Sequence, residues 1–209
     1  MQLTVINDVA CDPQTNMAND VALWQCVESA PDQAFLRFYD WIEPCVTYGR
    51  NQTPSHQLLI DVGAGEGAFP LVCRPTGGGI VFHQPSGITY SLIVPLSWLP
   101  FQQLIASYRC LGERTVEALK AVGIGAMLRQ ESLGGYQDKR HHEVCVSYPA
   151  KYEIVSSTGQ KLIGSAQRKG RVSLLQQTQV FGDVPLAFKE ALFQRLTVFF
   201  SIDGSLDRR

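Results

Sequence analysis

The alternation of apolar and polar side chains at the start of the chain predicts a strand followed by a helix. Residues 3–6 have the two-residue period of a half-buried strand, and Pro13 ends that pattern. Apolar side chains then recur every three or four residues over 17–27, which is the period of an amphipathic helix. We expect Thr15 or Asn16 to cap this helix, because short polar side chains accept hydrogen bonds from the backbone of a first turn.

Apolar runs in the next part of the chain predict further strands, since turn-forming residues separate runs of high strand preference. The runs lie at residues 34–39, 45–48, 70–74 and 79–94. The last two flank the turn RPTGGG and are expected to be adjacent strands. The stretch 57–68 before them is expected to be a poor helix or a surface loop.

A second helix and a β-meander are predicted in the second half. Apolar residues recur at helical spacing over 101–122, and Gly123 ends this helix. Three strands follow a polar stretch and are joined by tight turns at 158–159 and 169–170. The strands are expected at residues 151–157, 160–168 and 171–181. A last helix is expected to begin near Asp183.

The order of these elements favours the α+β class. Strands come mostly in runs with few helices between them, whereas a doubly wound parallel sheet alternates strands and helices regularly. We expect mixed, largely antiparallel sheets with flanking helices. No repeat, low-complexity block or proline-rich linker divides the chain, so residues 1–209 are expected to form a single domain.

Composition and charge narrow the function classes. With 209 residues and 45% hydrophobic side chains the chain suits one buried core, and a net charge of -1 with a pI near 6.4 argues against a nucleic-acid partner. No apolar run reaches the roughly 18 residues of a membrane span, and the N-terminus lacks a basic leader. We therefore expect a cytoplasmic protein without a membrane segment.

The cysteines do not have the spacing of a disulfide framework or a metal site. They are Cys11, Cys26, Cys45, Cys73, Cys110 and Cys145. They are widely scattered and form no C-x-x-C or similar pair, so we expect reduced thiols and no bound metal.

Two glycine clusters raise the question of a binding loop. DVGAGEG at 61–67 resembles the S-adenosylmethionine loop of methyltransferases, but Pro70 follows where that loop needs a helix and a second strand. We therefore expect this cluster on the surface. RPTGGG at 74–79 exposes backbone N–H groups without side chains, which suits the close approach of a ligand. A β-hairpin turn or bulge explains the same glycines equally well.

Four longer stretches resemble one enzyme family. They are DPQTNMANDVAL (12–23), LRFYDWIEPCVTYGRNQ (36–52), RPTGGGIVFHQPSGITYSLIVP (74–95) and CVSYPAKYEIVSSTGQKLIGSAQRKGRVSLLQ (145–176). In this order they are similar to the lipoate-protein ligases and octanoyltransferases, whose catalytic domain resembles that of biotin-protein ligases. RPTGGG and KLIGSAQ are the specific motifs. The resemblance covers most of the chain and implies a biotin/lipoyl protein ligase-like fold.

The resemblance also implies the site residues. Ligases of this family use ATP to make an acyl-adenylate, with the lysine of K-x-x-G-[SN]-A, here Lys161, at the activated carboxyl group. One group of transferases instead takes octanoyl onto the cysteine of a pattern similar to C-x-x-x-P-x-x-Y-E-[IL]-V. This chain reads CVSYPAKYEIV, which places Cys145 at the nucleophile position. The substrate-binding residues implied by the motifs are Arg74, Gly77, Gly78, Gly79, His83, Gly164, Ser165 and Ala166.

The pair of Cys145 and Lys161 suits thioester chemistry. A neighbouring cation lowers the pKa of a thiol below its free value of about 8.5, and the thiolate attacks the acyl donor. Lys161 would also donate to the oxyanion of the tetrahedral intermediate. This scheme needs no metal and no nucleotide. The alternatives are an inert core thiol between two valines and an ordinary solvated lysine paired near Ser156.

The other candidates have two interpretations each. His83 is expected either to orient the substrate or to be a satisfied strand histidine. Arg74 suits a phosphate, of the carrier's phosphopantetheine or of an adenylate, and a structural salt bridge is its alternative. His141 and His142 adjoin Cys145 but belong to a polar stretch that is expected to be a solvated loop.

Two departures from the family pattern bear on function. Where relatives often have L-L-Q-H-G, this chain has Gln177 and Thr178, so the usual histidine and glycine are absent from that wall. The chain also ends soon after its last helix, so we expect no C-terminal lid domain, which favours transfer over ATP use.

Three functional hypotheses follow. The first is an octanoyltransferase of lipoate synthesis, which moves octanoyl from acyl carrier protein, or from another lipoyl-domain protein, to a lipoyl-domain lysine without a cofactor. The acceptor would be the lipoyl domain of a 2-oxoacid dehydrogenase E2 or the glycine cleavage H protein. The second is an ATP-dependent lipoate-protein ligase, and the third is a catalytically silent acyl- or lipoyl-domain-binding module.

Overall fold

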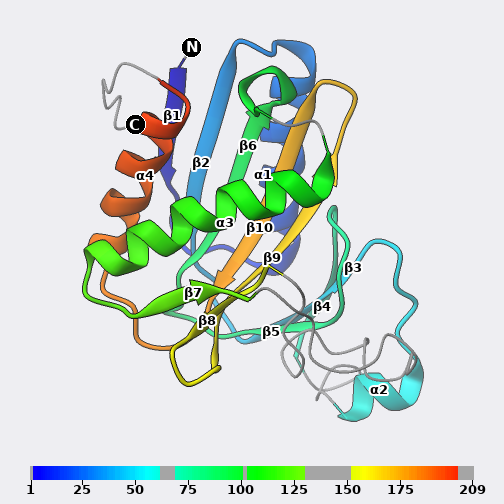
Figure 1. Ribbon diagram of the computed structural model, residues 1–209. Coiled ribbons are helices and arrows are strands. Elements are labelled where there is room, and N and C mark those ends of the chain that lie inside the picture. Colours follow the sequence, from blue (N-terminus) through cyan, green and yellow to red (C-terminus); the bar gives the residue numbers. More distant parts are fainter. Residues whose placement is uncertain (1, 62–68, 101–102, 130–151, 202–209) are drawn as a thin grey trace.

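The molecule is built on a large mixed sheet (Figure 1). The computed structural model describes residues 2–61, 69–100, 103–129 and 152–201. The strands of the large sheet are β1 (Gln2–Asn7), β2 (Gln33–Tyr39), β6 (Thr89–Pro95), β7 (Ala126–Leu128), β8 (Ile154–Ser156), β9 (Lys161–Lys169) and β10 (Ser173–Val180). In the described part of the chain their order is β1-β2-β6-β10-β9-β8-β7. Strands β1 and β2 are parallel, and the other neighbouring pairs are antiparallel.

A smaller sheet carries the glycine turn. It contains β4 (Leu71–Arg74), β3 (Cys45–Gly49) and β5 (Val81–His83) in that order. The sequence predicts that the segments flanking RPTGGG are adjacent strands, and this prediction is wrong, because β3 lies between β4 and β5 and pairs with both. Residues 75–80 are therefore a crossover past the end of β3 and not a β-hairpin.

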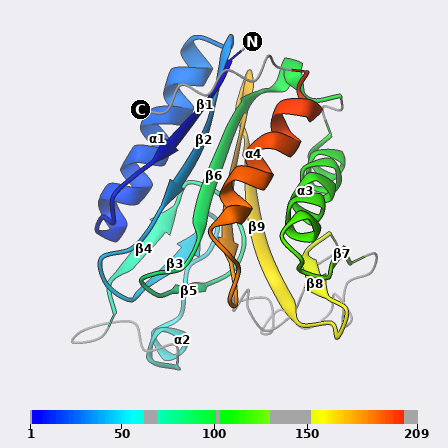
Figure 2. The ribbon, with the colours of Figure 1, turned by 90° about the vertical axis from the view of Figure 1, so that its left-hand side faces the viewer.

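Helices cover both faces of the large sheet (Figure 2). Helix α1 (Pro13–Ser29) packs on one face, against β6 and β10, while α3 (Leu104–Ala121) and α4 (Ala187–Phe199) lie together on the other. A short helix α2 (His56–Asp61) lies beside the small sheet, and a 3₁₀ turn (Leu96–Trp98) follows β6. The layers explain why residues 92–94 of β6 are apolar without alternation: Leu92 and Val94 belong to the core under α3 and α4, whereas Ile93 packs under α1.

The main features of the predicted fold are confirmed. The class is α+β, both sheets are mixed, and β8, β9 and β10 form the expected antiparallel meander. The helix expected at 101–122 is α3, which ends before Gly123, where φ is +84°.

Several predicted boundaries are wrong for local reasons. Asp12, and not Thr15 or Asn16, caps α1, since its Oδ1 accepts from the Thr15 N–H at 2.9 Å. The apolar run 79–94 is two strands, because the chain turns at Ser86, whose φ is +66°. Helix α4 begins at Ala187 and not near Asp183. Strand β7 is missed because three residues are too short for a visible period.

Neither a membrane-spanning helix nor a metal-binding cluster is found among the described residues. No helix there is both long and apolar enough to cross a membrane. No group of three or more histidine, cysteine, aspartate or glutamate side chains in the same residues is arranged to hold a metal ion.

Candidate active site

A pocket lies where the small sheet meets β9 and β10. Its empty space is about 460 Å³, including the opening to solvent. The predicted site residues that line it are Arg74, His83, Lys161, Gly164, Ser165 and Ala166. Met17 from α1, Tyr39 from β2 and the adjoining Trp41 complete an apolar wall. The fold thus brings predicted residues into one pocket although they lie as far apart in the sequence as Arg74 and Ala166.

The remaining predicted residues do not join this lining. Gly78 lines a neighbouring groove, and Gly77 and Gly79 contribute backbone carbonyls that accept hydrogen bonds from Arg74. Cys145 lies outside the described residues, together with His141 and His142.

Arg74 shapes the glycine turn. Its Nη2 donates to the carbonyls of Gly77 and Gly79 at 2.9 and 2.7 Å, and its Nη1 donates to Thr47 Oγ1 at 2.6 Å. The side chain is buried, so these bonds compensate for the loss of its hydration. Its guanidinium therefore has a structural role in holding the crossover against β3. The predicted contact of Arg74 with a substrate phosphate stays a prediction.

His83 belongs to a chain of buried hydrogen bonds across the two sheets. Thr47 Oγ1 accepts from Arg74 and lies 2.8 Å from His83 Nε2, and His83 Nδ1 lies 2.7 Å from Gln179 Oε1. Because the amide oxygen only accepts, Nδ1 carries the proton and Nε2 accepts from Thr47. Trp41 stacks on the imidazole with 4.3 Å between ring centroids. His83 is thus a satisfied strand histidine that also forms pocket wall.

His83 is held neutral. Burial lowers its pKa to about 3, the hydrogen bond to Gln179 opposes that shift, and the Arg74 charge adds to it. Between pH 6.5 and 3 the unfolded chain therefore binds a proton that the folded chain excludes. The contribution of neutral His83 to the free energy of unfolding is therefore fully present above the unfolded pKa and is lost as the pH falls toward the folded pKa.

We expect the free energy of unfolding to fall by about 1 kcal/mol between pH 7 and pH 5.5 through His83. His83→Asn keeps a donor for Gln179 but does not titrate, so its stability, although lower, should change less over this range. Urea unfolding at several pH values in this range measures both slopes. Equal slopes for the two proteins would rule out His83 as the source.

Lys161 is buried at the pocket wall, so the alternative of a solvated hairpin lysine is wrong. It opens β9 opposite Val155, one residue from the expected neighbour, because the β8–β9 register shifts between Ile154 and Val155. Its Nζ donates to Glu153 Oε1 at 2.7 Å, and the two side chains are only 6% and 9% exposed. A cation this deep needs such compensation.

The glycine of the KLIG segment makes room for this lysine. A methyl group on Gly164 would lie 2.9 Å from Lys161 Cε and 3.2 Å from its Nζ. The lysine side chain therefore crosses the bare backbone of Gly164 to reach Glu153. This contact is a physical reason for a glycine three residues after the lysine.

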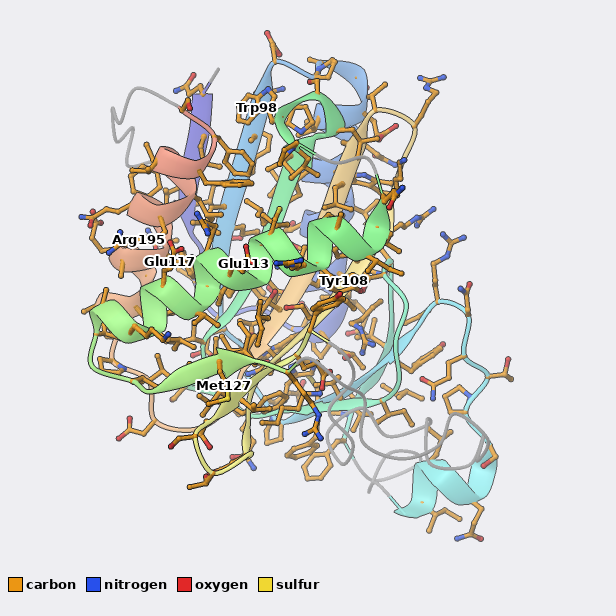
Figure 3. All side chains as sticks on the ribbon, in the orientation of Figure 1. Trp98, Tyr108, Glu113, Glu117, Met127 and Arg195 are labelled. Carbon is orange, nitrogen blue, oxygen red and sulfur yellow. The ribbon has the colours of Figure 1, made fainter. Side chains whose placement is uncertain are left out.

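A second groove adjoins the pocket on the α3 side. It is lined by Gly78, Ile105, Tyr108, Gly112, Tyr152, Glu153, Ile154, Ile163, Ser165 and Gln176. Ser165 lines both hollows, with Lys161 in one and Glu153 in the other, so the ion pair lies between them. Figure 3 shows Tyr108 on the side of α3 toward β9, where its hydroxyl oxygen accepts from the Gln167 N–H at 2.7 Å.

The cysteines of the described residues are not placed as nucleophiles of the pocket, since none of them lines it. Burial raises the pKa of Cys45 to about 12, to which Glu43 adds, and burial also raises the pKa of Cys110 to about 11. Both stay protonated at neutral pH. Cys26 and Cys73 are exposed.

Residues 12–197 match the catalytic domain described as lipoyl protein ligase A/B. The chain belongs to the lipoyl protein ligase A/B family. An octanoyltransferase LipM from Bacillus cereus is 32% identical over 187 residues, which cover 87% of this chain and 64% of that protein. An octanoyltransferase LipM from Lysinibacillus sphaericus is 30% identical over 211 residues, which cover 97% of this chain and 72% of that protein. The chain thus spans less than two thirds of the Bacillus cereus protein.

Solved structures of lipoate-protein ligases confirm the predicted fold. Lipoate-protein ligase A bound with ATP has a TM-score of 0.71 at 20% identity, with 100% of this chain and 88% of that chain covered. The bi-partite lipoate protein ligase from Thermoplasma acidophilum, studied with its E2 lipoyl domain, has a TM-score of 0.70 at 16% identity and the same coverage. The likeness concerns the fold of the lipoyl protein ligase A/B family.

Gln177, which departs from the lipoyl protein ligase A/B pattern, links two elements through hydrogen bonds. Its Nε2 donates to Asp20 Oδ2 and its Oε1 accepts from Thr76 Oγ1, both at 2.7 Å. It thereby joins α1 to the glycine turn. Thr178 Oγ1 lies 3.0 Å from Ser165 Oγ. Within the described residues both departing side chains have hydrogen-bond partners at this wall.

Gly49 allows the end of β3 to touch the glycine turn. A methyl group there would lie 2.6 Å from the Gly77 carbonyl carbon and would also overlap the Gly78 carbonyl. We expect Gly49→Ala to lower the free energy of unfolding by about 1–3 kcal/mol, because backbone must move to admit it. Urea unfolding measures the loss. Gly77→Ala is the matched control, since its methyl group would meet nothing within 4 Å; an equal loss in both variants would contradict this account.

Besides the apolar wall, sequence reasoning missed the residues that hold Lys161 and His83 in place. Glu153 pairs with Lys161, and a hairpin turn at 158–159 was the available signal, since it brings residues on its two sides together. Thr47 and Gln179 hold His83. No sequence signal points to them, because they come from β3 and β10, strands of different sheets that meet only in the folded chain.

Proposed function

We propose that this protein is an octanoyltransferase that forms a thioester on Cys145. The observation that carries the proposal is Lys161, a buried cation in the wall of a largely apolar pocket. An octanoyl chain suits the apolar part of the lining, and the ammonium group suits the developing oxyanion. The relatives named octanoyltransferase LipM support transfer over ATP-dependent ligation.

The first half-reaction loads the enzyme. The Cys145 thiolate attacks the carbonyl carbon of octanoyl-[acyl carrier protein], and the carbonyl oxygen becomes the oxyanion that Lys161 stabilises. The intermediate collapses with cleavage of the original C–S bond. The carrier's phosphopantetheine thiolate leaves and takes up a proton. Octanoyl is then bound to Cys145 as a thioester, and no oxidant or nucleotide is consumed.

The second half-reaction delivers the acyl group. The neutral amine of a lipoyl-domain lysine attacks the Cys145 thioester, and Lys161 stabilises the oxyanion again. The C–S bond to Cys145 breaks, the amine loses a proton, and an amide forms. The proposed acceptor is the lipoyl domain of a 2-oxoacid dehydrogenase E2 or the glycine cleavage H protein. We also propose that the enzyme acts in the cytoplasm and that residues 1–209 form a single catalytic domain.

A transfer assay without nucleotide tests this function. The full chain is incubated with a lipoyl domain and octanoyl-carrier protein, and the intact mass of the acceptor is measured. The proposal predicts one octanoyl group on the acceptor in the absence of ATP. Transfer only from free octanoate with Mg-ATP would identify a ligase, and carrier binding without product in either assay would identify a silent binding module.

A further inference from the structure

Two arginines flank the glycine turn from opposite sides. Arg50 follows β3 directly, and its backbone N–H donates to the carbonyl of Thr76 at 2.9 Å. Arg168 lies near the end of β9, and its Nη1 is 3.3 Å from the carbonyl of Pro75. Because Pro75 and Thr76 are consecutive, both arginines are anchored at one point of the turn.

Among the described residues, neither arginine has an ion-pair partner. In the part of the chain that the structure describes, the Arg50 side chain makes no hydrogen bond or ion pair, and Arg168 makes only the bond to Pro75 and a stacking contact with Trp24, 4.3 Å from the ring centroid. Arg50 is exposed and Arg168 is half-buried. Within the described residues, donors on both guanidinium groups thus remain without a hydrogen-bond partner.

The two positive charges affect each other. Burial lowers the pKa of Arg168, and the charge of Arg50 lowers it further, while Glu28 opposes the shift. The Glu28 carboxylate, however, already accepts from the backbone N–H groups of Arg171, Val172 and Ser173 and from the Ser173 hydroxyl. A bound anion would relieve the repulsion between the arginines that Glu28 leaves in place.

The pair lies at the outer end of the pocket. Side chains of alternate residues of a strand share a face, so Arg168 continues the row of Gly164 and Ala166, which line the pocket. At about 3.3 Å per residue, its Cα lies roughly 7 Å beyond that of Ala166. Arg74, by contrast, has its two terminal nitrogens directed at Thr47 and the turn carbonyls.

We propose that Arg50 and Arg168 bind a phosphate ester at the mouth of the pocket, namely the phosphodiester of the acyl donor's phosphopantetheine arm. The inference rests on the proposed function for the identity of the donor. A guanidinium group matches phosphate oxygens with paired N–H donors, and two such groups suit one anion. A donor anchored there extends its thioester inward along β9 toward Lys161.

Binding of the bare arm tests the site without catalysis. Calorimetric titration compares the binding of 4′-phosphopantetheine with that of pantetheine. The proteins are wild type, the double variant Arg50→Gln/Arg168→Gln, and the control Arg195→Gln at an exposed position of α4 (Figure 3). We expect the phosphate to tighten binding to wild type and the control by about tenfold or more at low salt, and this gain to vanish in the double variant and shrink at high salt. Thermal midpoints verify folding, and Arg168→Lys, which retains the charge, should keep part of the gain.

Several different results would contradict the proposed phosphate site. The first is that the two ligands bind equally to wild type or do not bind at all. The second is that the gain in affinity from the phosphate survives in the double variant. A gain for AMP over adenosine with none for phosphopantetheine assigns the arginines to a nucleotide and overturns the proposed site too. If the double variant loses affinity only for whole carrier protein, the two arginines contact the carrier's surface and not its phosphopantetheine arm. The acyl adduct on Cys145, measured in parallel, reports on the proposed function alone.

Discussion

Lys161→Met is expected to slow octanoyl transfer by about a hundred- to a thousandfold, because it removes a positioned oxyanion donor. Methionine keeps the length of the side chain, so the pocket wall is preserved. The loss should lie in the rate of acyl transfer and not in donor binding, since the interaction strengthens only as the oxyanion forms. Single-turnover acylation and donor affinity, measured separately, distinguish the two.

The ion pair provides a control for misfolding. Lys161→Met alone leaves Glu153 buried without its cation, which destabilises the fold. Adding Glu153→Leu removes that unpaired charge and should restore stability without restoring transfer. Recovery of transfer in the double variant would show that Lys161 acts only through stability, and a single variant with near-normal transfer would contradict its catalytic role.

Asp20→Asn is expected to lower the free energy of unfolding by about 3 kcal/mol. Asp20 Oδ1 accepts from Arg37 at 2.8 Å and from Ser91 at 2.7 Å, and Oδ2 accepts from Gln177 at 2.7 Å and from Tyr39 at 3.2 Å. Both Asp20 and Arg37 are fully buried. Asparagine leaves the Arg37 charge without its buried counter-ion and turns one acceptor into a donor that faces other donors.

Asp8→Asn is the matched control for Asp20→Asn. Asp8 also pairs with Arg37, at 2.6 Å, but its side chain is 30% exposed, so water replaces much of the lost interaction. We expect it to cost only about 1 kcal/mol. Guanidinium chloride unfolding measures both losses. Similar small losses for the two variants would mean that the cluster around Asp20 contributes little to stability.

Local signals in the sequence predicted most of the elements, because their periods are long enough to see. Helix α3 and the strands β9 and β10 each extend over eight or more residues. The short strand β7 and the position of β3 between β4 and β5 follow from tertiary pairing, which no local pattern records.

The two glycine clusters show where local reasoning is insufficient. RPTGGG is held by its own Arg74, by Gln177 and by the close approach of Gly49, and the last two come from distant segments of the chain. The pairing of β3 with both β4 and β5 overturns the hairpin interpretation, and the binding-loop interpretation stays a prediction. DVGAGEG lies mostly outside the described residues; only its first residue, Asp61, closes helix α2. Its surface position therefore stays a prediction.

The resemblance to the lipoate-protein ligases supplied what periodicity did not. Lys161 opens β9 and Glu153 directly precedes the neighbouring strand β8, yet nothing in the spacing of a lysine in a hairpin distinguishes a buried cation from a solvated one. The motif KLIGSAQ made that distinction, and the packing of Lys161 over Gly164 gives its physical basis. The placement of Cys145 still rests on the motif CVSYPAKYEIV alone.

The intact mass of the enzyme after incubation with octanoyl-carrier protein tests the thioester mechanism most directly. We predict one octanoyl group on wild type and on Cys26→Ala and Cys73→Ala, whose thiols are exposed but lie outside the pocket lining. Cys145→Ala should carry none, and adding a lipoyl domain should move the group from the wild-type enzyme to the acceptor. An adduct that persists in Cys145→Ala, or transfer to the acceptor without any adduct on wild type, would contradict the mechanism.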